Sequence, residues 1–311
     1  MSAPDDIAPV AGDGKAADTP ETSSVAVTAF NAIPPPGLVL LAIAAIQIGA
    51  GVAIHLFPIL GAEGTVAYRI LFSVLLLLFA VRRRLGILWS AFRKHWLLLV
   101  IFGVCIGAMN LFFYQAIARI PLGAAVTIEF IGPLGIAVFG SRRLSHFLWV
   151  SLAVFGIVLL SPISGGDIDS LGVMFALLAG GCWAAFIVLA KRMGQAMPGN
   201  DALVVGMTIA AILMLPYAVP VAGELFSNPL VLAVAFGVAL LSTTIPFTLE
   251  FHALKRMTTR AYGILISLEP AVGALVGAVI LGERIGLQGM IAVACVVVAA
   301  IGITYTDRSN A

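Results

Sequence analysis

The sequence predicts an all-α membrane protein of ten transmembrane helices, arranged as two inverted five-helix repeats. Of its 311 residues, 61% are hydrophobic and only 10% are charged, and the mean hydropathy is +1.11. Soluble domains carry about 25% charged residues, so most of this surface must face lipid. The apolar runs do not alternate as the strands of a membrane barrel would. The third observation is a pattern that recurs in the two halves.

Ten segments are apolar enough to form spanning helices, which need about 20 mostly apolar residues. Helices are required because lipid offers no hydrogen-bond partner to the backbone. The second and fifth segments are short and would borrow flanking residues, and the longest connection, 82–95, leaves no room for a soluble domain. The expected spans are 38–57, 66–81, 96–115, 122–139, 147–161, 171–190, 202–221, 230–249, 261–281 and 285–305.

The N-terminal segment differs sharply in composition from the rest of the chain. Residues 1–36 are rich in Ala, Asp, Pro, Thr and Ser and carry five acids against one base, Lys15. A secretory signal needs a basic start and an apolar run, so we interpret this segment as a disordered cytoplasmic tail. We expect the first repeat at 37–162, the second at 163–306, and a short cytoplasmic C-terminus at 307–311.

Positive charge is distributed unevenly between the predicted loops. With the N-terminus inside, the cytoplasmic loops hold eleven Lys and Arg residues, whereas the outside loops hold only Arg119 and Arg284. Cytoplasmic loops of membrane proteins carry this excess. We therefore predict a multi-pass protein of the bacterial inner (plasma) membrane with both termini in the cytoplasm.

The repeat is visible at the ends of the third and eighth predicted spans. Ala-Ile-Ala-Arg at 116–119 matches Ala-Leu-Lys-Arg at 253–256, and the same register pairs Pro133 with Pro270. Each half then holds five helices, and an odd number inverts the second half in the membrane. Inverted repeats with a midplane site between them are a common transporter construction, which favours transport over a purely structural role.

Two acids lie inside predicted spans beside these prolines. Glu129 precedes Pro133 by four residues, and Glu269 immediately precedes Pro270. A charge at mid-membrane costs about 2.5–3.5 kcal/mol on insertion scales, so both are functional candidates. Each proline also frees a backbone carbonyl that an ammonium group can use. We predict Glu129 as a substrate-binding residue, and Glu269, Pro133 and Pro270 in coupling or gating. The alternative is a packing kink with each acid paired to an Arg or Tyr.

Neutral polar and aromatic side chains complete the predicted cavity. We expect Asn110, Tyr114, Trp183 and Gln47 to bind the substrate, although ordinary interhelical packing is the alternative for each. Arg69 lies about one turn inside the second predicted span. It either pairs with an acid or a substrate carboxylate, as a coupling or gating residue, or extends outward to the interface.

The sequence contains none of the motifs that would indicate an enzyme or an ATP-driven pump. The sequence holds no P-loop, no HExxH and no Ser-His-Asp set, so we predict neither an enzyme nor an ATP-driven pump, and no cofactor or metal. The net charge of +2 gives no reason to expect a nucleic-acid partner. The expected partners are a small-molecule substrate, the lipid bilayer and, as an open question, protons. Monomer and homodimer both stay open.

Several motifs resemble one transporter family. They are Glu-Phe-Ile-Gly-Pro-Leu at 129–134, Ser-Arg-Arg at 141–143, Leu-Glu-Pro at 268–270 and Gly-Glu at 282–283. From about 38 to 304 the chain resembles the EamA branch of the drug/metabolite transporter superfamily, and within it the bacterial threonine/homoserine exporters of the RhtA type. The resemblance implies efflux of threonine, homoserine or related amino acids by alternating access. An exporter of another metabolite or drug, and a non-transporting membrane receptor or scaffold, are the alternatives.

Overall fold

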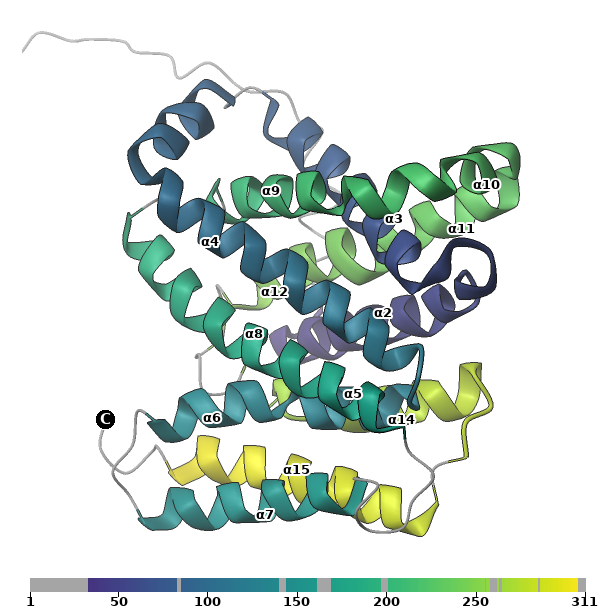
Figure 1. Cartoon of the computed structure of the whole chain (residues 1–311). Coiled ribbons are helices and arrows are strands. Elements are labelled where there is room, and N and C mark those ends of the chain that lie inside the picture. The colour runs from purple at the N-terminus through teal and green to yellow at the C-terminus, as the bar shows by residue number, and fades with distance from the viewer. Residues whose placement is uncertain are drawn as a thin grey trace, which may run out of the picture. The chain divides into compact units, whose positions relative to one another are not determined.

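The computed structural model is built from helices, and no strand occurs among the residues it describes (Figure 1). The chain separates into two units, Met1–Pro34 and Pro35–Ala311, and every helix below lies in the second unit. The described residues are 33–82, 85–139, 144–160, 169–196, 201–254, 256–257, 262, 265–284 and 286–306. The predicted tail at 1–36 and C-terminus at 307–311 therefore lie almost entirely outside the described residues.

The first part of the chain forms helices where apolar spans are predicted. They are α2 (Pro35–Ile54), α3 (Phe57–Ala80), α4 (Leu85–Ile117), α5 (Leu122–Glu129), α6 (Ile131–Phe139) and α7 (Leu144–Leu160).

The second part is also helical, with one irregular stretch. Its elements are α8 (Ser170–Ala196), α9 (Asp201–Ala218), the 3₁₀ turn η3 (Val219–Val221), α10 (Ala222–Ser227), α11 (Pro229–Ala239), the π-helical turn η4 (Leu240–Thr244), α12 (Ile245–Leu254), α14 (Glu269–Ile280) and α15 (Leu287–Thr306).

Five stretches of the described residues are long and apolar enough to cross a membrane. They are Pro35–Ile54, Phe57–Ala80, Phe92–Ile117, Ser170–Ala190 and Asp201–Ser227. Shorter apolar helices occur at Leu122–Gly135, Pro229–Thr244, Glu269–Ile280 and Leu287–Gly302. An all-α, multi-pass membrane protein is therefore confirmed, while the number of crossings and the inversion of the two halves stay predictions.

The connection predicted at 82–95 is itself mostly helical, and the apolar span that follows it begins at Phe92. Helix α4 begins at Leu85 and bends at His95, whose backbone angles are φ −126° and ψ 27°. Leu85, Leu88 and Phe92 recur at helical spacing. A search for continuous apolar runs misses this pattern because basic residues interrupt it.

The helices pack closely where small residues face one another. A Cβ atom on Gly103 of α4 would lie only 2.5 Å from Cβ of Ile209 and 2.8 Å from the carbonyl oxygen of Gly206, both on α9. A Cβ on Gly123 of α5 would lie 2.6 Å from Cα of Ala274 on α14. Glycine at these positions lets backbones approach in a way that larger side chains forbid. The α5–α14 contact brings together the two helices that carry the predicted acids.

Candidate functional site

The helix carrying Glu129 is interrupted directly after that residue. Helix α5 ends at Glu129 and α6 begins at Ile131, while Phe130 between them keeps helical backbone angles (φ −63°, ψ −12°), so the interruption is a lost hydrogen bond and the helical course continues. Pro133 contributes to the interruption because it has no amide hydrogen to donate to the carbonyl of Glu129. The break places this carboxylate at the end of a helix inside the protein.

The second acid lies at an equivalent break. In the register that pairs Pro133 with Pro270, Phe130 corresponds to Ser267, and residues 267–268 form the turn that precedes α14. Helix α14 then begins with Glu269. Both helices are therefore interrupted at the same position of the predicted repeat, and each has its acid next to the interruption.

Both carboxyl groups are removed from solvent and lie within electrostatic range of each other. Glu129 is 8% exposed and Glu269 is 9% exposed. Glu129 interacts electrostatically with both Glu269 and the guanidinium group of Arg69. The Oε2 atom of Glu269 has no hydrogen-bond partner among the described residues. Arg69 acts on Glu129, so a further positive group would compensate the second buried acid, Glu269.

Arg69 points into the protein. Its guanidinium carbon lies 5.0 Å from the ring centroid of Tyr114, and its Nε atom is buried without a hydrogen-bond partner in the described part of the chain. Helix α3 begins at Phe57, so Arg69 lies three turns inside it, deeper than the sequence suggests. The alternative that Arg69 extends outward to the interface is therefore wrong.

Tyr114 and Gln47 add unpartnered polar atoms to the same region. The side chain of Tyr114 is fully buried, and its hydroxyl group has no hydrogen-bond partner among the residues described. Gln47 of α2 is also buried, and its Oε1 atom has no partner within the described chain. That Oε1 atom lies beside α14, 3.4 Å from where a Cβ on Gly273 would be.

We call Glu129, Glu269, Arg69, Tyr114 and Gln47 the central polar cluster. These side chains come from five helices: α5, α14, α3, α4 and α2. Buried polar atoms in native proteins almost always have a partner, so unpartnered atoms in one cluster need an explanation. A bound zwitterion would give these atoms partners. Its ammonium group would pair with the carboxylates, and its carboxylate would accept hydrogen bonds from the Arg69 guanidinium and the Tyr114 hydroxyl.

Two further predicted site residues, Trp183 and Asn110, are not members of the central polar cluster. Trp183 of α8 packs its ring edge-on against Phe130, with ring centroids 5.7 Å apart, and so contacts the break beside Glu129. Asn110 donates from Nδ2 to the carbonyl of Ile106 on its own helix at 2.8 Å. The structure therefore brings Trp183 to the interruption after Glu129, and one of the two Asn110 amide hydrogens bonds to the backbone of its own helix.

A third acid, Glu250, lies near the cluster, although the sequence gives no reason to include it among the predicted site residues. Glu250, in the last turns of α12, accepts a hydrogen bond from the Tyr262 side chain and interacts electrostatically with Glu269. Its position near the end of an apolar span suggests a residue at the membrane surface. Only the fold brings it toward Glu269.

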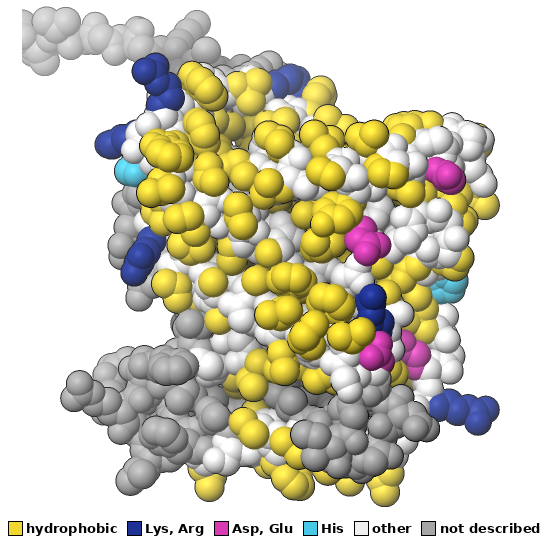
Figure 2. Space-filling model, viewed as in Figure 1, with side chains coloured by type: hydrophobic (Ala, Val, Ile, Leu, Met, Phe, Trp, Pro, Cys, Tyr) yellow, Lys and Arg dark blue, Asp and Glu magenta, His cyan; other side chains and the backbone are white. Residues whose placement is uncertain are grey.

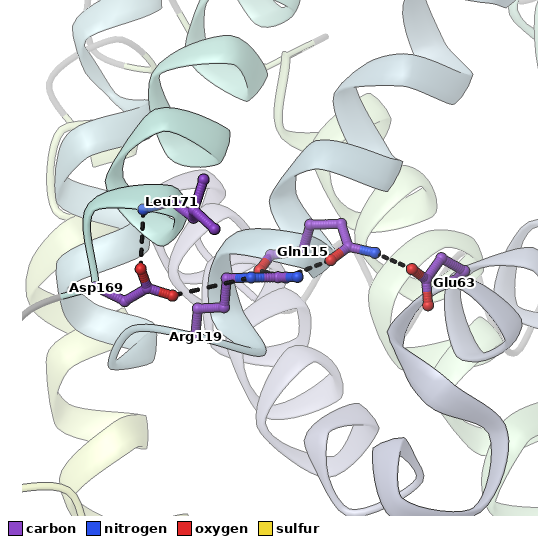
Figure 3. A network of polar contacts seen from close by, with 5 residues as sticks. All are labelled: Glu63, Gln115, Arg119, Asp169 and Leu171. Carbon is purple, nitrogen blue, oxygen red and sulfur yellow. Dashed lines mark hydrogen bonds and ion pairs between the residues drawn. The ribbon is translucent and has the colours of Figure 1, made fainter.

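A second polar network ties together the ends of three helices (Figure 3). Gln115 of α4 donates from Nε2 to the carboxylate of Glu63 on α3, and Arg119 donates to the Gln115 side-chain oxygen. Arg119 Nε also lies 3.9 Å from a carboxylate oxygen of Asp169, whose other oxygen accepts from the Leu171 amide at the start of α8. We call Glu63, Gln115, Arg119 and Asp169 the end network.

Comparisons with known proteins give both a family and a fold. The model of the EamA-like transporter family matches residues 170–305. A crystal structure that shares 18% identity covers 88% of this chain and 98% of its own, with a TM-score of 0.56. At that identity the likeness shows a shared fold.

Several known proteins are similar over most of the chain. The threonine/homoserine exporter RhtA of Escherichia coli K12 is 39% identical over 285 residues, which cover 88% of this chain and 92% of that protein. The RhtA exporter of Salmonella typhimurium SL1344 is 39% identical over 284 residues, covering 87% and 91%. The uncharacterized transporter YwfM of Bacillus subtilis 168 is 26% identical over 223 residues, covering 69% and 75%.

Proposed function

The chain belongs to the EamA-like transporter family, and from this premise we propose that it exports small amino acids of the threonine and homoserine type from the cytoplasm. The observation that carries the proposal is the central polar cluster, where the buried Glu129 interacts with both a second buried acid, Glu269, and the Arg69 guanidinium. The names of the RhtA relatives support the substrate class.

The substrate is held by opposite charges at its two ends. Glu129 binds the ammonium group, and the Arg69 guanidinium and Tyr114 hydroxyl bind the carboxylate. Gln47 contributes a side-chain oxygen, and Trp183 and Phe130 limit the size of the cavity.

Transport proceeds by alternating access. Glu129 is 8% exposed and Tyr114 0% exposed, so a solute reaches them only when the helices separate. The breaks next to Glu129 and Glu269 allow segments on either side to move separately. The end network joins α3, α4 and α8. We propose that it holds these three helices together until a substrate has bound to the central polar cluster.

The membrane arrangement that suits this mechanism has ten helices in two inverted halves, 37–162 and 163–306, with both termini in the cytoplasm. The equivalent breaks at Phe130 and Ser267 support the repeat. The family model covers 170–305, close to the proposed second half.

Glu269 carries a proton in exchange for the solute. Its carboxyl group is buried beside Glu129 and Glu250, and two adjacent buried acids favour having one of them protonated. Substrate binding at Glu129 changes the charge that Glu269 experiences and so links proton release to loading.

A flux measurement tests the proposal. Purified protein in liposomes loaded with radiolabelled threonine or homoserine, with and without a pH gradient, should show efflux above protein-free liposomes. Efflux should rise when the outside is more acidic. Efflux of other metabolites or drugs, with none of threonine or homoserine, would reassign the substrate. Absence of any solute flux would favour a receptor or scaffold.

A further inference from the structure

An apolar groove of about 430 Å³ lies between α3, α4 and α9, apart from the central polar cluster. Leu78 of α3, Trp89 and Phe92 of α4, and Ile212 of α9 line it. Thr208 is a polar residue in this lining, and its hydroxyl donates to the Val204 carbonyl of its own helix at 2.7 Å. The groove therefore offers an occupant apolar contact and little hydrogen bonding, which suits a hydrocarbon chain.

Three basic residues lie close in the sequence to residues that line this groove. Arg82 is one turn beyond Leu78, and Arg93 directly follows Phe92. Lys94 lines a second surface hollow, of about 280 Å³, together with Trp96. Figure 2 shows Lys and Arg side chains grouped around the first turns of α4, beside hydrophobic surface that continues along α4 and α9. In the described part of the chain, neither Arg93 nor Lys94 has an acidic partner.

The first turns of α4 have the character of a helix at a membrane surface. This segment ends at the bend at His95, and its Trp89 ring is 63% exposed and stacks on Phe92 at 5.7 Å between centroids. An exposed tryptophan next to lysine and arginine is typical of the interface, where the ring meets lipid and the cations meet phosphate.

We propose that this groove binds an anionic phospholipid, with one acyl chain between α3, α4 and α9 and the phosphate on Arg82, Arg93 and Lys94. Charge complementarity selects the occupant, because Arg82, Arg93 and Lys94 lie within four residues of the apolar groove lining along α3 and α4. The bend at His95 lets the cations lie at the headgroup level while the following residues of α4 continue into the apolar layer. The proposal does not depend on which solute the protein carries.

Native mass spectrometry of the detergent-purified full chain tests the site. The protein is titrated with phosphatidylglycerol or with phosphatidylcholine of the same acyl chains. We expect the wild type to retain one phosphatidylglycerol at least about tenfold more strongly than phosphatidylcholine, because two to three cations contribute. The double variant Arg93→Gln with Lys94→Gln should lose this preference, and Thr208→Trp should reduce binding of both lipids by filling the groove.

Two control variants distinguish loss of this lipid site from the general effect of removing a cation or adding a tryptophan. Arg192→Gln removes another exposed cation, on α8, and Leu148→Trp adds a tryptophan at an exposed position of α7. Both should bind phosphatidylglycerol as the wild type does. Equal retention of the two lipids by the wild type, or unchanged binding by the Arg93 and Lys94 double variant, would overturn the proposal. So would a dimer that Thr208→Trp dissociates, because the groove would then hold a second copy.

Discussion

The carboxylate of Glu283 accepts hydrogen bonds from the backbone amide of Leu122, at 3.0 Å to Oε1 and 3.1 Å to Oε2. Leu122 begins α5, whose N-cap residue, Pro121, provides no side-chain cap. Glu283 follows α14 and so supplies the missing cap from the other half of the chain. Because α5 ends at Glu129 and α14 begins at Glu269, this contact joins the two helices at the ends remote from the acids.

Removal of this cap should destabilise the protein. Glu283→Ala leaves the first amides of α5 without an acceptor, and loss of an N-cap costs typically about 1 kcal/mol. Glu283→Gln retains one side-chain oxygen and should lose less. The midpoint of thermal unfolding in detergent measures the effect. Equal midpoints for the wild type and Glu283→Ala would show that the contact contributes nothing.

The same carboxyl group predicts a dependence of stability on pH. Burial raises the pKa of Glu283 above that of an exposed glutamate, and hydrogen bonds from the Leu122 and Gly123 amides lower it only in part. A pKa raised in the folded state stabilises the protein below the unfolded value, about 4.3, and this contribution is lost as pH rises through the folded pKa. The stability of the wild type relative to Glu283→Gln should therefore fall from pH 4 upward, as unfolding midpoints measured in parallel would reveal. A difference that rises with pH would contradict this assignment.

Gly180 and its neighbour Gly181 should differ sharply in their tolerance of a side chain. A Cβ on Gly180 would lie 2.5 Å from the carbonyl oxygen of Glu129, whereas one on Gly181 would meet nothing within 4 Å. Gly180→Ala should push α8 away from the α5–α6 break and cost about 1–3 kcal/mol, a typical effect of overpacking. Unfolding midpoints and threonine efflux at matched protein level measure it. Gly181→Ala is the control, and equal behaviour of the two variants would refute the close contact.

Tyr114→Phe should separate function from stability. The Tyr114 hydroxyl is buried without a partner among the described residues, so its removal leaves no other group unpaired and should not lower the unfolding midpoint. If the hydroxyl binds the substrate carboxylate, the concentration for half-maximal efflux should rise about tenfold, the equivalent of one hydrogen bond to a charged group. Unchanged efflux kinetics in the variant would exclude Tyr114 from binding.

The two acids were predictable from the sequence because a charge within an apolar span is costly, and the interruption after Glu129 follows from the missing donor of Pro133. The inward direction of Arg69 was not predictable, since it depends on the ring of Tyr114 from another helix. The Glu283–Leu122 contact joins residues far apart in the sequence, and no local pattern reveals it. The helical start of α4 was missed because its basic residues interrupt the apolar run.

The central claim is that Glu129, in a buried cluster with Arg69 and Glu269, binds the transported solute. Efflux of radiolabelled threonine from proteoliposomes with Glu129→Gln tests it most directly, with Glu224→Gln, at an exposed glutamate, as the matched control. We predict that Glu129→Gln folds to the same level as the wild type and loses at least about 90% of efflux, since a charge-assisted contact of about 1.5–3 kcal/mol is removed, and that Glu224→Gln keeps its efflux. Wild-type efflux by Glu129→Gln at equal protein level would contradict the account.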